Sequence, residues 1–167
     1  MSSTTTTPIT TLAHKNIETL RKHYIEFLTN NPPTSRTHTS LESLGAHFSP
    51  SVSYIYFFGE IQKTRQGLIQ AQKAMGDTCP PMEQRVEEEE FDVLWEGDKG
   101  DATLVRVKES WWTGEKKLVI WGTYFYVRDG SAPEGVRVVS YQETNVAKET
   151  TMEFGPSAGV PEDGGSA

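Results

Sequence analysis

The 167-residue chain carries a formal net charge of −7, and hydrophobic residues make up 35% of it. This length predicts one domain, and four Trp, six Tyr and seven Phe are enough to build its core. The charge argues against a nucleic-acid partner, because phosphate binding needs clustered Lys and Arg, and the basic residues here form no stripe. We therefore expect partners that are neutral or apolar.

The single cysteine, Cys79, excludes an intrachain disulfide and any metal site built from several cysteines. The first residues lack the basic start and the apolar run of a signal peptide, and no stretch is long enough to span a bilayer. We therefore expect a soluble, cytoplasmic protein that does not associate with membranes and has no metal site.

Both ends of the chain have a composition typical of disorder. Residues 1–11 are rich in Ser and Thr, and residues 148–167 are rich in Gly and Pro. Such segments bury too little apolar surface to offset the entropy of ordering. We therefore predict two disordered tails around a single α+β domain at residues 12–147.

The first half of this domain is expected to be largely helical. A first helix ends before Pro32, and its buried stripe is formed by Ile17, Leu20, Tyr24, Phe27 and Leu28. A second, short helix is expected to begin with Ser40 as its cap and to turn Leu41, Leu44 and Phe48 inwards. After a strand over 52–58, which is apolar on both faces, a third helix is expected over 67–75.

Four extended segments follow, at about 83–96, 102–113, 117–128 and 135–146, and Gly-containing turns join them. Consecutive hairpins make an antiparallel meander, which usually buries one face against helices. The sequence therefore predicts an α+β fold in which an antiparallel sheet curls around the helices.

Two carboxylates lie on strands where the alternation of side chains matters. Glu109 falls in the apolar set of its strand, between Val107 and Trp111, and is expected to point inwards unless the strand end twists or bulges. Glu143 shares one face with Tyr141 and Asn145, but both faces of that strand contain valine, so periodicity leaves its direction open. A buried carboxyl would have a raised pKa and could act as a general acid or base.

Tyrosines are the second group of polar side chains that could contribute to a site. Tyr24 lies on the apolar stripe of the first helix, Tyr54 and Tyr56 share a face of the first strand, and Tyr124 and Tyr126 share a face of a later one. A phenol in the wall of an apolar pocket can donate a hydrogen bond to a developing oxyanion. The alternative for each is a core tyrosine whose hydroxyl bonds to the backbone.

The order of these elements, and the spacing within residues 20–28, 48–56 and 65–69, resembles the nuclear transport factor 2-like (NTF2-like) superfamily, especially its SnoaL-like cyclase and ketosteroid isomerase branches. The resemblance covers about residues 17–146. It implies a cone-shaped, curved sheet wrapped around the N-terminal helices, with a cavity that needs no cofactor. It also implies that Tyr141, Glu143 and Asn145 face this cavity.

Position by position, Tyr24 matches the oxyanion-hole tyrosine of the isomerases. Tyr56 stands where the isomerases have their aspartate base, as a tyrosine does in scytalone dehydratase, and Tyr124 stands where they have a protonated aspartate. The strand histidines of the dehydratase have no counterpart here. Because the usual aspartate base is absent, Glu143 is expected to replace it.

The first hypothesis is a cofactor-independent isomerase, cyclase or dehydratase that transfers protons on a small, apolar, oxygenated secondary metabolite of polyketide or terpenoid type. The expected catalytic residues are Glu143, Glu109, Tyr24, Tyr56 and Tyr124. The expected substrate-binding residues are Tyr54, Phe58, Trp95, Trp111, Tyr126, Tyr141 and Asn145.

The second hypothesis is a non-catalytic module of the same fold that binds a ligand or serves as a protein adaptor. A cavity lined by both Glu109 and Glu143 would favour the enzyme, whereas a cavity filled by Tyr and Trp side chains would favour the adaptor. Many relatives pair through the outer face of the sheet, so the resemblance also implies a homodimer through Trp112, Phe125 and Val127.

Overall fold

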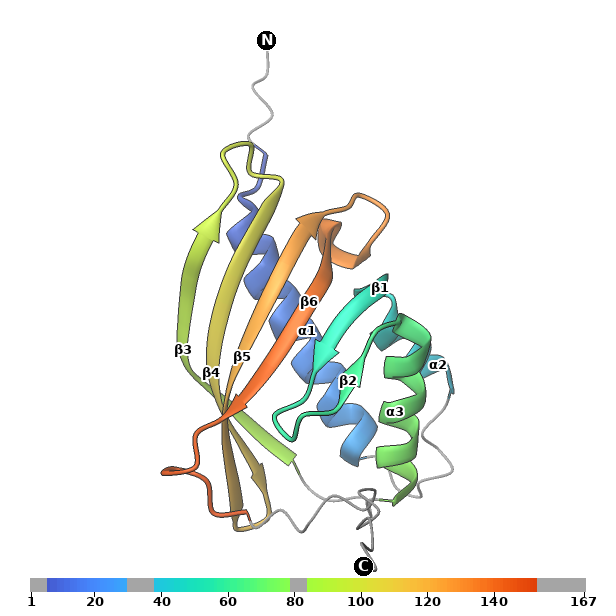
Figure 1. Cartoon of the computed structure of the whole chain (residues 1–167), viewed down its shortest axis with the longest axis vertical. Coiled ribbons are helices and arrows are strands. Elements are labelled where there is room, and N and C mark those ends of the chain that lie inside the picture. The colour runs from blue at the N-terminus through green and yellow to red at the C-terminus, as the bar shows by residue number, and fades with distance from the viewer. Residues whose placement is uncertain (1–5, 30–37, 79–83, 153–167) are drawn as a thin grey trace, which may run out of the picture.

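The computed structural model describes residues 6–29, 38–78 and 84–152, in which three α-helices accompany a six-stranded sheet (Figure 1). In chain order the elements are α1 (Ile9–Thr29), α2 (His38–Gly45), β1 (Phe48–Ile55), β2 (Ile61–Gln62), α3 (Arg65–Thr78), β3 (Gln84–Glu96), β4 (Ala102–Thr113), β5 (Lys116–Arg128), the 3-10 turn η2 (Pro133–Gly135) and β6 (Val136–Asn145). Helices and short strands precede a run of long strands, which confirms the predicted α+β class.

The strands lie in the order β2-β1-β6-β5-β4-β3. β3, β4, β5 and β6 pair antiparallel as consecutive hairpins, as predicted, whereas β1 pairs parallel with β6. The antiparallel prediction therefore holds for the meander and not for the β1–β6 pair. A hairpin fixes the direction only of strands that follow each other directly, and α3 and the meander separate β1 from β6.

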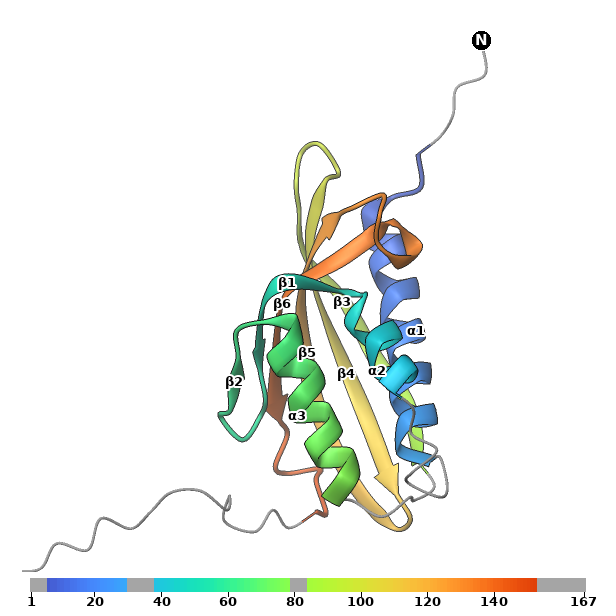
Figure 2. The same ribbon diagram turned by 90° about the vertical axis from the view of Figure 1, so that its right-hand side faces the viewer.

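The helix α1 runs along one face of the curved sheet, while α3 lies beside β1 and β2 (Figure 1, Figure 2). On α1, apolar residues recur every three or four positions and are at most 2% exposed; they are Ile9, Ala13, Ile17 and Leu20. They pack against buried valines and tyrosines of the strands. The sheet and α1 therefore form the core, and α3 closes one side of it.

Several boundaries differ from the sequence-based prediction. The first helix begins at Ile9, which is fully buried, so part of the predicted tail 1–11 is ordered. α2 begins at His38 rather than after Ser40, and Phe48 opens β1 instead of lying on α2. Ile9 and Phe48 are both buried, and local spacing could not show that burial. Most of the predicted tails, at residues 1–5 and 153–167, falls outside the described residues.

The segment after β6 also departs from the predicted tail. The hydroxyl of Thr150 accepts a hydrogen bond from the backbone N–H of Val119 at 3.1 Å, and that of Thr151 accepts one from Lys117 at 2.7 Å. Residues up to 152 thus continue along β5. In the described ranges 6–29, 38–78 and 84–152, none of the helices is both long and apolar enough to cross a membrane.

Candidate functional site

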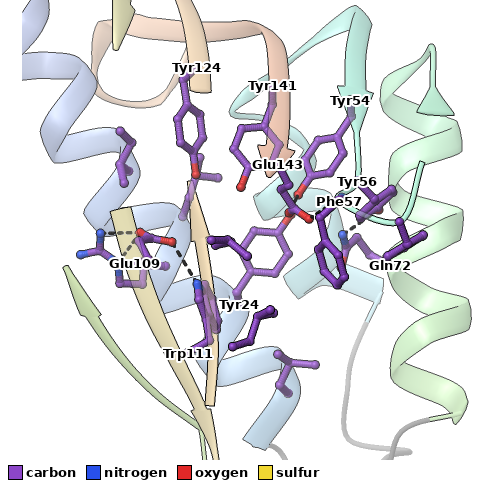
Figure 3. A pocket seen from close by; sticks show the side chains of 17 residues that line it. Tyr24, Tyr54, Tyr56, Phe57, Gln72, Glu109, Trp111, Tyr124, Tyr141 and Glu143 are labelled. Carbon is purple, nitrogen blue, oxygen red and sulfur yellow. Dashed lines mark hydrogen bonds and ion pairs between the residues drawn. The ribbon is translucent and has the colours of Figure 1, made fainter. Parts of the chain in front are cut away.

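A cavity of about 170 Å³ lies between α1, the inner face of the sheet, the end of β1 and α3 (Figure 3). Aromatic and aliphatic side chains form most of its wall, and few polar groups interrupt them, as is usual for a small-molecule site. The lining residues are Ile17, Leu20, Arg21, Tyr24, Leu28, Tyr54, Tyr56, Phe57, Phe58, Gln72, Glu109, Trp111, Leu118, Ile120, Tyr124, Tyr141 and Glu143.

The register of the central strand β5 brings the two carboxylates to this cavity from opposite sides. Ile120 pairs with Glu109 of β4, and two residues further along the same strand Gly122 pairs with Glu143 of β6. Since side chains two apart share a face, both glutamates project to the same side of the sheet. The predicted inward direction of Glu109 is confirmed, and Glu143 lines the same cavity.

Gly122 leaves room for the tyrosines that cover this part of the strand. A Cβ at this position would lie 3.0 Å from the Tyr141 hydroxyl and 3.0 Å from the ring of Tyr124. The rings of Tyr124 and Tyr141 lie 4.3 Å apart between centroids. The missing side chain therefore lets two phenols pack closely over β5 beside Glu143.

Glu143 is held by hydrogen bonds and by no charge. The Tyr54 hydroxyl donates to its Oε1 at 3.1 Å, and the backbone N–H of Phe57 donates to its Oε2 at 3.4 Å (Figure 3). None of the ion pairs among the described residues includes Glu143. Burial outweighs the pKa-lowering effect of Tyr54, the Phe57 backbone and the nearby Tyr141 hydroxyl, and raises the pKa of Glu143 to about 7. Near neutral pH this carboxyl can therefore either take up or release a proton.

Glu109 is held in a different way. The guanidinium Nε of Arg21 donates to its Oε1 at 2.9 Å, and the indole N–H of Trp111 donates to its Oε2 at 3.0 Å. Arg21 also donates to Glu88, which bonds His14, each at 2.8 Å. The Glu109 side chain is only 4% exposed. Both of its oxygens are thus engaged with protein donors, and one of those donors is a cation.

The phenols in the wall differ in what their hydroxyls contact. The Tyr24 hydroxyl is buried and has no hydrogen-bond partner in the described part of the chain. The Tyr54 hydroxyl is close enough to influence the pKa of Tyr24, but no hydrogen bond of good geometry joins the two. The Tyr56 hydroxyl accepts a bond from Gln72 Nε2 at 2.9 Å. Burial raises the pKa values of Tyr24, Tyr56 and Tyr124 above the ordinary range, so all three remain protonated donors at neutral pH.

Comparison with known proteins rests on structure alone, because no family model and no curated protein sequence matches this chain. An NTF2-like protein of unknown function from Pseudomonas aeruginosa is similar, with a TM-score of 0.65 and 18% identity over 80% of this chain and 98% of that one. The chain has the NTF2-like fold. At this level of identity the likeness establishes the fold and leaves the activity to be argued from the site.

Two other solved structures with the NTF2-like arrangement have different described roles. A proposed ketosteroid isomerase from Parabacteroides distasonis has a TM-score of 0.54 and 15% identity, covering 78% of this chain and 85% of that one. The CaMKII hub of S. rosetta has a TM-score of 0.59 and 13% identity, covering 81% of this chain and 95% of that one. One NTF2-like architecture therefore accompanies both an enzyme-like and a hub description.

Most of the residues predicted for the site lie in the NTF2-like cavity. They are Glu143, Glu109, Tyr24, Tyr56, Tyr124, Tyr54, Phe58, Trp111 and Tyr141. Phe58 lies at the rim, where 48% of its surface is exposed. Their common location supports a shared site, although their individual roles stay predictions.

Trp95, Tyr126 and Asn145 do not line the cavity. A register shift between Val93 and Trp95 places Trp95 opposite Leu104, and its ring packs near Phe125 while half its surface is exposed. Asn145 ends β6, and its Oδ1 accepts a hydrogen bond from the Thr150 hydroxyl at 2.7 Å.

Tyr126 is fully buried towards the other end of α1 and donates to Asn16 Oδ1 at 3.1 Å. Tyr126 lies on the same face of β5 as Tyr124, as predicted. It is two residues beyond Tyr124, however, and the cavity does not extend that far along the strand. Alternation gives the face of a strand but not how far along the strand a cavity reaches.

Three polar partners in the site were not predicted. Arg21 lies four residues after Ile17 on α1, and Gln72 lies four residues after Leu68 on α3, so helical spacing carried a signal for both. The N–H of Phe57 comes from a residue beyond the end of β1 and had no signal in the sequence.

Proposed function

We propose that this protein is a cofactor-independent enzyme that transfers protons on a small, largely apolar, oxygenated metabolite. The reaction class is isomerisation, cyclisation or dehydration, and the substrate is of polyketide or terpenoid type. The observation that supports this most is the state of Glu143, a carboxyl with a pKa of about 7 in an aromatic cavity, with no cation paired to it among the described residues.

In the proposed reaction Glu143 removes a proton from a carbon next to a substrate carbonyl and returns it, or another proton, to a different atom. The carbonyl oxygen gains negative charge as this proton leaves, and protonated phenols stabilise it by donating hydrogen bonds. Tyr24 and Tyr56 supply such donors. Tyr124 and Tyr141 shape the wall beside the carboxyl.

In this proposal Glu109 is not an acid or base, although its position in the sequence suggested that role. Its contacts with Arg21 and Trp111 occupy both oxygens, so a proton transfer would first have to break a buried ion pair. We assign it the role of a fixed charge that anchors α1 to β4. Its negative charge also contributes to the raised pKa of Glu143.

The test begins with metabolites of the source organism made with and without the gene. Loss of the gene should cause an unrearranged, uncyclised or hydrated precursor to accumulate, and the purified protein should convert that precursor without an added cofactor. Conversion in D₂O should place deuterium at the carbon that is reprotonated. An unchanged metabolite profile together with no conversion by the purified protein would contradict the proposal.

The alternative is a binding or adaptor module, which the similarity to a CaMKII hub favours. This alternative predicts that replacing the cavity carboxylate Glu143 leaves the biological role intact. Changes on the outer face of the sheet would then have the larger effect.

We also propose that the chain forms a homodimer through that outer face, at Trp112, Phe125 and Val127. The Trp112 ring lies 4.8 Å from the Arg85 guanidinium and 5.3 Å from the Lys117 ammonium, and its indole N–H is buried without a partner in the described residues. Sedimentation should give a dimer at micromolar concentration, and Trp112→Ala should weaken it. A monomer at that concentration would exclude this interface.

A further inference from the structure

The Tyr56 hydroxyl is bonded on its acceptor side only. A phenol has one hydrogen to donate and two lone pairs that accept. Gln72 Nε2 donates to this oxygen at 2.9 Å, and no described residue accepts the hydrogen of Tyr56. The Tyr56 residue is 4% exposed and Gln72 is 3% exposed. Both groups line the cavity, so the cavity is where this hydrogen can find an acceptor.

The neighbouring phenol Tyr54 is arranged in the opposite sense. Its hydrogen is donated to Glu143 Oε1, which leaves Tyr54 little capacity to donate to a ligand. The rings of Tyr54 and Tyr56 lie 4.6 Å apart between centroids, so the two phenols stand side by side (Figure 3). One phenol therefore serves the carboxyl, and the other presents a donor from the side of α3.

We propose that Gln72 is a positioning residue that fixes the Tyr56 hydroxyl as a donor into the cavity, and that the α3 side of the cavity takes an acceptor oxygen of the substrate. This inference rests on the proposed function and narrows its substrate class to molecules with a carbonyl at that end. A ligand group that only donates, such as an ammonium, would leave the Tyr56 hydrogen without an acceptor.

α3 supplies the amide at a fixed place. Gln72 follows Leu68 by four residues, and Leu68 is 1% exposed, so the same helix face that anchors α3 in the core carries the amide to Tyr56. A buried amide is costly unless it is bonded, and its bond to Tyr56 lowers that cost. The NH₂ group of this amide faces the Tyr56 oxygen and can only donate, so in this orientation the Tyr56 hydrogen is left for another acceptor.

The test compares Gln72→Glu with Gln72→Met in the full-length protein. Both replacements keep the approximate size of the side chain. Burial raises the pKa of a carboxyl at this position, so binding is measured above pH ~8, where this Glu is ionised. An ionised Glu can only accept, so it should draw the Tyr56 hydrogen out of the cavity. Met bonds the hydroxyl in neither direction and leaves the hydrogen able to reach a ligand.

The probes are 1-tetralone labelled with ¹³C at the carbonyl and tetralin, which has the same rings without the oxygen. The wild-type protein should bind the ketone more tightly than the hydrocarbon and shift its carbonyl resonance downfield. Gln72→Glu should weaken ketone binding roughly tenfold, the loss of about one hydrogen bond, with no change for tetralin. Gln72→Met should keep most of the resonance shift.

Tyr56→Phe provides a variant that remains informative if Gln72→Glu fails to fold. It should remove the downfield shift, and adding Gln72→Met to it should cause no further loss of ketone affinity. The inference is overturned if the wild-type protein does not prefer the ketone, if Gln72→Glu keeps the shift, or if tetralin and tetralone lose affinity equally. The probe experiments need no turnover, so they can succeed when the search for a reaction fails.

Discussion

Glu109 and Glu143 line one cavity from the two strands that flank β5, yet their surroundings differ. On the Glu109 side, α1 supplies the guanidinium of Arg21. On the Glu143 side, β1 and the residues after it supply a phenol and a backbone N–H, and no described residue supplies a cation. The same side chain on the same face is thus part of a buried ion pair at Glu109 and a carboxyl with a raised pKa at Glu143, according to which element packs against it.

Among the changes at the two glutamate sites, we expect the replacement Glu143→Gln to have the largest effect, a loss of turnover. Removing a general acid or base typically lowers the rate ~10²–10⁴-fold, so kcat should fall by about that factor. The fold should remain intact, because Gln can still accept the hydrogen bond from Tyr54. Steady-state kinetics on the substrate and circular dichroism measure the two results. Unchanged turnover would remove Glu143 from the mechanism.

Removing the cation from the other side should affect stability first. Arg21→Met leaves the buried Glu109 carboxylate without its ion-pair partner and should lower the free energy of unfolding by about 3–5 kcal/mol. Denaturant unfolding measures this change. The matched variant Arg21→Met/Glu109→Gln should recover much of the loss, because it also removes the charge. Equal loss in both variants would show that packing, and not the charge, is responsible.

The raised pKa of Glu143 should make the free energy of unfolding depend on pH. A carboxyl whose pKa is raised on folding stabilises the folded protein when the pH is below the pKa that this carboxyl has in the unfolded chain. This stabilisation is lost as the pH rises to the pKa that it has in the folded protein. For Glu143 the window extends from the ordinary value of 4.5 to about 7. The wild type should therefore lose up to about 3 kcal/mol relative to Glu143→Gln across this window. Urea unfolding of both proteins at several pH values measures it, and parallel pH profiles would contradict it.

Gly122→Ala should have the smallest effect on stability and activity, and it tests whether the tyrosines beside Gly122 shape the site. Its Cβ would lie 3.0 Å from Tyr124 and Tyr141, so these rings must shift away. Overpacking of this kind costs about 1–3 kcal/mol, and kcat/KM should fall about tenfold if the rings shape the site. Gly130→Ala is the control, because a Cβ there meets no atom within 4 Å. Equal effects of the two variants would exclude a specific role for Gly122.

The sequence predicted the cavity carboxylates better than it predicted their environment. Alternation on β4 placed Glu109 inside, and a family resemblance gave Glu143 its direction where valines on both faces left the pattern ambiguous. The pairing of Glu109 with Arg21 depends on how α1 crosses the sheet, and no local pattern contains that crossing.

The errors have the same origin. Trp95 was expected in the cavity, but it lies near the end of β3, where Val93, Leu94 and Trp95 are each about half exposed, and its ring packs beside Phe125. β3 also has two register shifts, each of which reverses the faces of the residues up to the next shift, and neither has a signal here in residue type. Likewise, no local pattern predicts that β1 runs parallel to β6, because contacts between distant segments set that pairing.

The most direct test of the central claim is an NMR titration of the glutamate side-chain carboxyl carbons, with Glu143→Gln used to assign the resonance of Glu143. We expect this carboxyl to titrate near pH 7, because burial raises its pKa. Titration near the ordinary value of 4.5 would contradict the claim that the cavity prepares Glu143 for proton transfer.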